Sequence, residues 1–188
     1  MARKLIALFL TAVLLLPAVA LGESTPLPFG LKLGMNAQET EAAFKADATL
    51  SKASPDKSST DVGTVDYVFD DLSIPGTDLA ASLNVEIDRN NSPQEDRLTS
   101  LIFQISPTGG SIAAFRQLLT SITASLGAPD NDPFDADAVS QYVEWGTLDA
   151  SWTKEDARVS LSLSRMFEEN LTVQYSSRLN YDPADLAE

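Results

Sequence analysis

Acidic side chains gather most densely in one short segment of the chain. Asp130, Asp132, Asp135 and Asp137 lie close together, with an asparagine among them. Calcium takes several oxygen ligands, and one flexible loop can supply them. The spacing is not that of an EF-hand, because Phe134 occupies the fifth position and no glycine follows it. The four aspartates are a calcium candidate, but their composition is equally ordinary for a loop, so we predict no metal and no cofactor.

Pairs of carboxylates are the second chemistry that the sequence offers. Glycoside hydrolysis can run on two such groups without histidine. The candidate pairs are Glu86 with Asp88, and Glu144 with Asp149 or Glu155. Glu86 and Asp88 alternate with apolar residues, which places both on the polar face of a strand. We therefore expect a solvated sheet surface there rather than a catalytic pair.

Two residue types that carry much enzyme chemistry are absent, because the sequence contains no histidine and no cysteine. Their absence excludes Ser-His-Asp and Cys-His nucleophiles and the usual zinc ligands. The tetrapeptide at residues 54–57 matches S-x-x-K. That nucleophile needs a helix N-terminus and a K-T-G partner, whereas this match lies in a polar segment of a chain without K-T-G. No catalytic residue is predicted, and the chain is not expected to be an enzyme.

Aromatic side chains in the second half could form a binding face. They are Tyr142, Trp145, Trp152 and Tyr175. Trp145 continues the alternation of Val139 and Val143, and buried aromatics at strand spacing usually pack in a core. We therefore expect this face, with Val139, Val143 and Trp145, to belong to the core.

Residues 1–22 have the layout of a secretory signal peptide. Arg3 and Lys4 precede a run from Leu5 to Leu16 that only one threonine interrupts, and small residues ending at Ala20 and Gly22 offer cleavage sites. The apolar run is too short to span a bilayer, which takes about 20 residues. The sequence thus predicts export to the periplasm or medium, with no membrane insertion after processing.

The processed chain is strongly acidic. Removing Arg3 and Lys4 leaves 11 basic residues against 27 acidic ones, a formal charge of −16. Such a chain repels phosphate backbones and anionic lipid surfaces. Nucleic acid is therefore excluded as an expected partner, and another exported or envelope protein is favoured.

The elements that must position these residues follow from hydrophobic spacing. A helix is expected from a capping box at Asn36 and Glu39 to about Asp47, and a second from Ser111 as cap to Gly127. The second helix has an apolar stripe at helical spacing, which suits packing across a sheet. The stripe consists of Ile112, Phe115, Leu118, Leu119, Ile122 and Leu126. Period-2 alternation predicts the strands, which lie near residues 65–69, 81–87, 101–105, 139–145, 148–152, 159–163 and 171–175. This pattern indicates an α+β fold with antiparallel strands and helices on one side of the sheet.

The order of elements suggests two similar units in tandem, at residues 23–107 and 108–179, followed by an acidic, frayed tail at 180–188. The sequences VDYVF and SQYVEW are similar, and Tyr67 aligns with Tyr142. Residues 81–87 likewise resemble residues 157–163, and residues 101–106 resemble residues 171–176. The shared order of elements favours duplication over chance.

The segment FGLKLGMNAQETEAAF, at residues 29–44, carries a resemblance. It resembles the opening of a helix–strand unit common in small exported bacterial proteins, in which a strand ends in Gly-Met and a capped helix follows. Two such units in tandem resemble the β-lactamase inhibitor protein fold and the related outer-membrane assembly lipoproteins. The known inhibitor has disulfides and the lipoproteins an anchoring cysteine, and this chain has neither. The resemblance implies a binding or scaffolding role and assigns no functional residue.

Together these observations predict an exported soluble protein of binding or scaffolding type. The expected partner is a protein, bound through the exposed sheet face or the loops. The alternative is a carboxylate-based hydrolase acting on cell-wall or extracellular glycans, and a third possibility is a purely structural envelope component.

Overall fold

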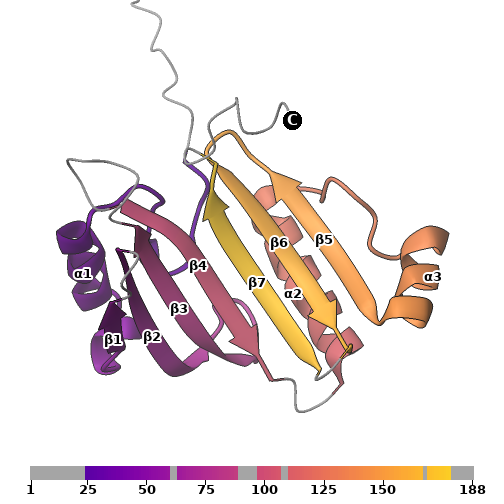
Figure 1. Cartoon of the computed structure of the whole chain (residues 1–188), viewed down its shortest axis with the longest axis horizontal. Helices are drawn as coiled ribbons and strands as arrows, with labels where there is room; N and C mark the ends of the chain where they lie inside the picture. Colours follow the sequence, from indigo (N-terminus) through magenta and orange to yellow (C-terminus); the bar gives the residue numbers. More distant parts are fainter. Residues whose placement is uncertain (1–23, 60–62, 89–96, 107–109, 167–168, 179–188) are drawn as a thin grey trace, which may run out of the picture.

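A single antiparallel sheet of seven strands forms the body of the protein (Figure 1). The computed structural model describes residues 24–59, 63–88, 97–106, 110–166 and 169–178. The expected signal peptide (1–22) and the expected tail (180–188) lie outside these residues. The strands are β1 (Asp56–Ser59), β2 (Thr64–Ser73), β3 (Ala80–Asp88), β4 (Arg97–Ile105), β5 (Thr147–Thr153), β6 (Ala157–Ser164) and β7 (Asn170–Ser177). The predicted α+β class with antiparallel strands is confirmed at this level.

Across the sheet the strand order is β1-β2-β3-β4-β7-β6-β5. The consecutive strands β2, β3 and β4 are neighbours, as are β5, β6 and β7. The two groups meet along β4 and β7, where Phe103 lies opposite Val173. The last strand in sequence therefore lies inside the sheet, and β1 and β5 form its edges.

Alternation along each strand separates two faces of different chemistry. One face is apolar and buried, with Leu83, Leu101 and Leu161 each 0% exposed. The opposite face is open and consists mainly of small polar side chains. One row across it runs Val68, Asn84, Ile102, Gln174, Ser160 and Ser151. Where described helices pack on the sheet, α1 through Phe44 and α2 over β6, they cover the apolar face, as one-sided alternation predicts.

Helix α1 (Ala37–Ala46) begins at the predicted capping box. The Asn36 side chain accepts a hydrogen bond from the Glu39 amide at 2.9 Å, and the Glu39 carboxylate accepts one from the Asn36 amide at 3.0 Å. Phe44 anchors the helix, because its ring packs edge-on against Tyr67 and Phe69 of β2. The thin apolar stripe of this helix thus amounts to one large side chain.

Helix α2 (Ser111–Leu126) lies over the second group of strands and packs mainly on β6 (Figure 1). Its N-cap is Gly110, so the prediction that Ser111 caps the helix is wrong by one residue. The predicted end is confirmed, since Gly127 has a φ of 85°, which glycine adopts without strain. Within the expected stripe, Leu118 and Ile122 are buried, whereas Leu119 is only partly so.

A third helix, α3 (Ala136–Trp145), replaces the strand predicted near residues 139–145. Asp135 caps it by accepting a hydrogen bond from the Ala138 amide at 2.7 Å, and Gly146 ends it in the left-handed conformation. The alternation misled because Val139 and Val143 also stand at i and i+4, a helical spacing. Tyr142 and Tyr67 are therefore not equivalent, and Trp145 is not a core residue.

Among the described residues no helix is long and apolar enough to cross a membrane. One short strand and two 3₁₀ turns, η1 (Pro28–Gly30) and η2 (Leu50–Lys52), were not expected. Strand β1 escapes prediction because its four residues are all polar and exposed.

Candidate functional site

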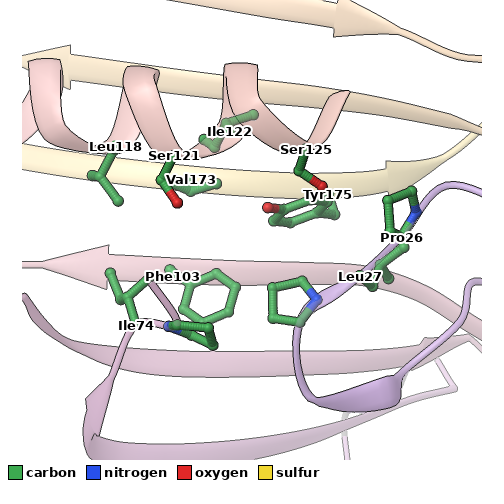
Figure 2. A pocket seen from close by; sticks show the side chains of 12 residues that line it. Pro26, Leu27, Ile74, Phe103, Leu118, Ser121, Ile122, Ser125, Val173 and Tyr175 are labelled. Atoms are coloured by element: carbon green, nitrogen blue, oxygen red, sulfur yellow. The ribbon is translucent and has the colours of Figure 1, made fainter. Parts of the chain in front are cut away.

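A groove crosses the apolar face of the sheet above β4 and β7, where the two groups of strands meet (Figure 2). Its volume is about 200 Å³. Phe103 and Val173 form part of its floor, α2 forms one wall, and the segment around Pro26 and Pro28 lies on the other side. The groove exists because α2 packs mainly on β6, which leaves the central strands to be covered by loops.

The N-terminal side of the groove is fixed to the second half of the chain. The Asp156 carboxylate, in the turn between β5 and β6, accepts hydrogen bonds from both the amide and the hydroxyl of Thr25. Leu31, just beyond η1, is 1% exposed and belongs to the core. This wall is thus held at both ends.

The groove lining is apolar except for three hydroxyl groups. Leu118, Ile122, Ser121 and Ser125 come from the same face of α2, because they are spaced by three and four residues. Tyr175 of β7 supplies the third hydroxyl. In Figure 2 the hydroxyls of Ser121, Ser125 and Tyr175 lie along the same wall.

Tyr175 stands out among these residues because it is only 8% exposed. Within the described part of the chain, no group lies within hydrogen-bonding reach of its hydroxyl. Burial raises the pKa of Tyr175 to about 12, with no neighbouring charge or hydrogen bond contributing. The phenol is therefore neutral at physiological pH and can both donate and accept a hydrogen bond.

A second feature is a set of exposed apolar side chains on and beside α3, the helix that lies at the outer edge of the sheet beyond β5 (Figure 1). Val139 and Val143 of α3 are 42% and 81% exposed, and Trp145 is 60% exposed. Met166, in the turn after β6, is 59% exposed. We call these four residues the α3 surface. Among the described residues, no other large hydrophobic side chain is so exposed.

Helix α3 is held to the sheet by its other side. The Arg165 guanidinium donates a hydrogen bond to the Tyr142 hydroxyl at 3.0 Å, and the Arg165 amide donates one to the Gly146 carbonyl at 2.8 Å. Tyr142 packs partly buried against the core. The helix is thus anchored through Tyr142 while its valines face outward.

Three of the four aspartates of the calcium candidate accept hydrogen bonds from backbone amides. Asp130 accepts a hydrogen bond from the Thr153 amide, Asp132 from the Phe134 amide, and Asp135 caps α3. Asp137 lies exposed in the first turn of α3. Among the described residues no three acidic side chains are grouped so that they could hold a metal ion.

The candidate carboxylates of the hydrolase alternative are dispersed. Glu144 lies on α3, Asp149 on β5 and Glu155 in the turn before β6. Glu86 lies on the open face as expected. Its neighbour across the strands is Asp66 of β2, in addition to Asp88 along its own strand. Partial burial, and secondarily the negative charge of Asp66, raises the pKa of Glu86 above its usual value.

Replacing Glu86 with glutamine should therefore stabilise the protein at neutral pH. A raised carboxyl pKa means that the folded state holds the proton more tightly, so stability falls as pH rises past the pKa of the unfolded chain. We expect the melting temperature of Glu86→Gln to exceed that of the wild type at pH 7, and the gain to disappear near pH 3. Glu155→Gln, on an exposed turn, is the control. An equal shift at both pH values would show that charge is not the cause.

One cluster of polar groups was not anticipated. Tyr67 donates a hydrogen bond to the Glu41 carboxylate at 2.6 Å, and Lys57 of β1 forms an ion pair with the same carboxylate at 3.0 Å. These contacts, the Tyr67 hydrogen bond foremost, lower the pKa of Glu41. They tie α1 and the edge strand to β2.

Ser54 lies before β1 and not at a helix N-terminus, so the S-x-x-K match lacks the geometry of a nucleophile.

The four aromatic candidates lie in three different places. Trp152 is fully buried and donates a hydrogen bond from its indole nitrogen to the Gly127 carbonyl at 2.9 Å. Tyr175 borders the groove, and Tyr142 and Trp145 belong to α3. The described residues of the open sheet face form polar rows with isolated aliphatic side chains and no aromatic one.

Comparison with known proteins gives no relative for this chain. No protein-family model matches it, and neither the curated proteins nor the solved structures contain a match.

Proposed function

We propose that this chain is an exported protein-binding protein, and that it binds its partner through the α3 surface. The observation that carries the proposal is the exposure of four large apolar side chains on α3 and the turn that hydrogen-bonds to its C-terminal end, namely Val139, Val143, Trp145 and Met166. Exposed apolar groups gathered in one place and rimmed by polar residues are typical of protein interaction sites. Trp and Met are also enriched at such interfaces.

The fold does not require these side chains to be apolar. Tyr142 and the Asp135 cap already hold α3 in place. Val143, at 81% exposed, adds almost nothing to the core and has lower helix propensity than alanine. A partner that covers α3 would explain its presence.

Charge at the rim points to a basic partner. Asp135, Asp137 and Glu144 of α3 are exposed around the apolar residues, and Asp149 is exposed on the adjacent β5. A second copy of this acidic chain would bring like charges together, which costs free energy and slows association. We infer that the partner presents an apolar stripe flanked by Lys or Arg, as an amphipathic basic helix does.

The remaining expectations stand as proposals beside this one. Residues 1–22 support export, and N-terminal sequencing of the native protein tests it, since an N-terminus at Met1 would contradict cleavage. The resemblance to the inhibitor fold and the assembly lipoproteins agrees with a binding role. The strand order supports tandem duplication. Phe103 and Val173 occupy equivalent positions in the similar sequences 101–106 and 171–176, and they face each other across the antiparallel pair β4 and β7.

The α3 surface can be tested with a defined probe. The double variant Val143→Ser, Trp145→Ser should bind an amphipathic helical peptide of Leu and Lys at least tenfold more weakly than the wild type, because two apolar anchors are lost. The matched control is Ser140→Ala, Gln141→Ala, which changes two exposed polar residues of the same helix. Titration calorimetry in 50 mM and 300 mM NaCl provides the measurement.

The outcomes separate three cases. Binding that is lost in the double variant, retained in the control and weakened by salt supports the proposal. If a peptide of Leu and Glu binds as tightly as the peptide of Leu and Lys, charge does not select the partner, and the inference of a basic partner is wrong. Concentration-dependent dimerisation of the wild type that the double variant lacks would assign the surface to self-association and overturn the basic partner.

A further inference from the structure

The groove over β4 and β7 is separate from the α3 surface, and its lining has a definite chemistry. None of its twelve lining residues carries a charge. The protein as a whole has 40 charged residues and a formal charge of −14. Such a lining offers no counter-ion to a charged ligand, and desolvating an unpaired charge there is costly. The groove therefore selects a neutral occupant.

The size of the groove limits that occupant to about one ring. Small-molecule sites for drug-sized ligands occupy about 300–1,000 Å³. An apolar cavity of about 150 Å³ is known to accept benzene. At about 200 Å³, this groove has room for a single ring with a small substituent.

One largely buried side chain turns a polar group toward this space. Tyr175 is 8% exposed, and among the described residues its hydroxyl has no hydrogen-bond partner. The hydroxyl borders the groove itself, where water or a ligand oxygen can pair with it. A ligand oxygen in the groove would satisfy it, and the hydroxyls of Ser121 and Ser125 on the same wall could add to the binding (Figure 2).

We propose that the groove binds a small neutral molecule with a single-ring apolar body and one hydrogen-bonding oxygen, which pairs with the Tyr175 hydroxyl. The ring lies on Phe103 and Val173, between α2 and the proline-containing segment. Pro26, Pro28 and Pro75 line the groove, and their fixed backbone angles limit collapse of the loops into it. The proposal does not depend on the α3 surface.

The test uses phenol and toluene, which differ by one hydroxyl group in place of a methyl group. Methyl NMR titration of the wild type should show saturable shifts at Val173 and Ile122 with both probes, and tighter binding of phenol. Tyr175→Phe keeps the ring and removes the hydroxyl. It should weaken phenol binding about threefold to tenfold and leave toluene binding unchanged, since one neutral hydrogen bond is lost. Tyr142→Phe, which removes a hydroxyl that lies on α3, outside the groove, and is bonded to Arg165, should change neither.

A second variant tests the location. Ser121→Leu, with folding checked by circular dichroism, should abolish binding of both probes by filling the groove. Equal affinity of phenol and toluene for the wild type, or no effect of Tyr175→Phe, would overturn the role of the hydroxyl. Absence of saturable shifts at millimolar concentrations of either probe would overturn the site itself.

Discussion

Replacing Leu118 or Ile122 with alanine should cost about 2–5 kcal/mol of unfolding free energy, the range for deleting buried aliphatic groups. Both side chains are buried against the sheet, at 1% and 6% exposed. Helix α2 is the long helix of the second half. Through these residues it packs on β6 and forms one wall of the groove. The chain has no cysteine, so no disulfide offsets the loss. Such a loss is a large part of the roughly 5–15 kcal/mol that a domain has.

Urea denaturation of the two variants measures this effect, with Thr120→Ala as the control. Thr120 is exposed on the opposite face of α2 and bonds only to the Arg116 carbonyl of its own helix, so its replacement should change stability by about 0.5 kcal/mol or less. Arg116 and Gln117 are poorer controls, because Arg116 lies over the Phe134 ring and Gln117 donates a hydrogen bond to Asp78. If Leu118→Ala and Ile122→Ala were as harmless as the control, α2 would not be the helix that holds the second half together.

Replacing Phe44 with alanine should be at least as damaging, at about 3–5 kcal/mol, the range for buried aromatic residues. Phe44 is the one large side chain that α1 buries, and its ring centroid lies 5.2 Å from that of Tyr67 and 5.0 Å from that of Phe69. These edge-on contacts add to the burial energy. Without Phe44, the helix retains its capping box and the surface contacts of Glu41, which are worth little.

Hydrogen exchange of the α1 amides distinguishes local from global loss. In Phe44→Ala the amides of α1 should exchange faster than those of β6 and β7, because the helix loses its anchor first. Lys45→Ala, one residue on and exposed, is the control and should leave both rates near those of the wild type. Unchanged protection of α1 in Phe44→Ala would mean that the helix is held by contacts other than the aromatic cluster.

The sequence was sufficient to predict those helices and strands whose hydrophobic or capping pattern has a single interpretation. Strands β3, β6 and β7 alternate strictly because one face is buried, and α1 has the two side chains that make a capping box. The spacing in α3 is ambiguous, since the pair Val139 and Val143 satisfies both an alternating strand and the i, i+4 spacing of a helix, whereas Trp145 fits only the alternation. The deciding signals were Asp135 and Gly146 as caps, and both also suit a loop.

The groove could not be predicted in the same way. Its lining comes from five separate stretches, around residues 26–28, 74–75, 103, 118–125 and 173–175. No local pattern relates these stretches, because the strand order β4-β7 that brings them together is a tertiary choice. The one local signal is Ser121 and Ser125, which interrupt an otherwise apolar helix face at a spacing of four. The α3 surface was missed because Val143 and Trp145 were assigned to the core.

The central place of β7 sets the order in which the protein can fold. Residues of β4 and β7 that pair with each other are about 70 positions apart, and the Thr25 contact with Asp156 spans 131. Pairings of such long range form slowly. Until residues 170–177 have been synthesised and have left the ribosome, β4 and β6 each have an unpaired edge that other strands can pair with. A chain that ends before these residues would therefore be prone to strand-to-strand aggregation.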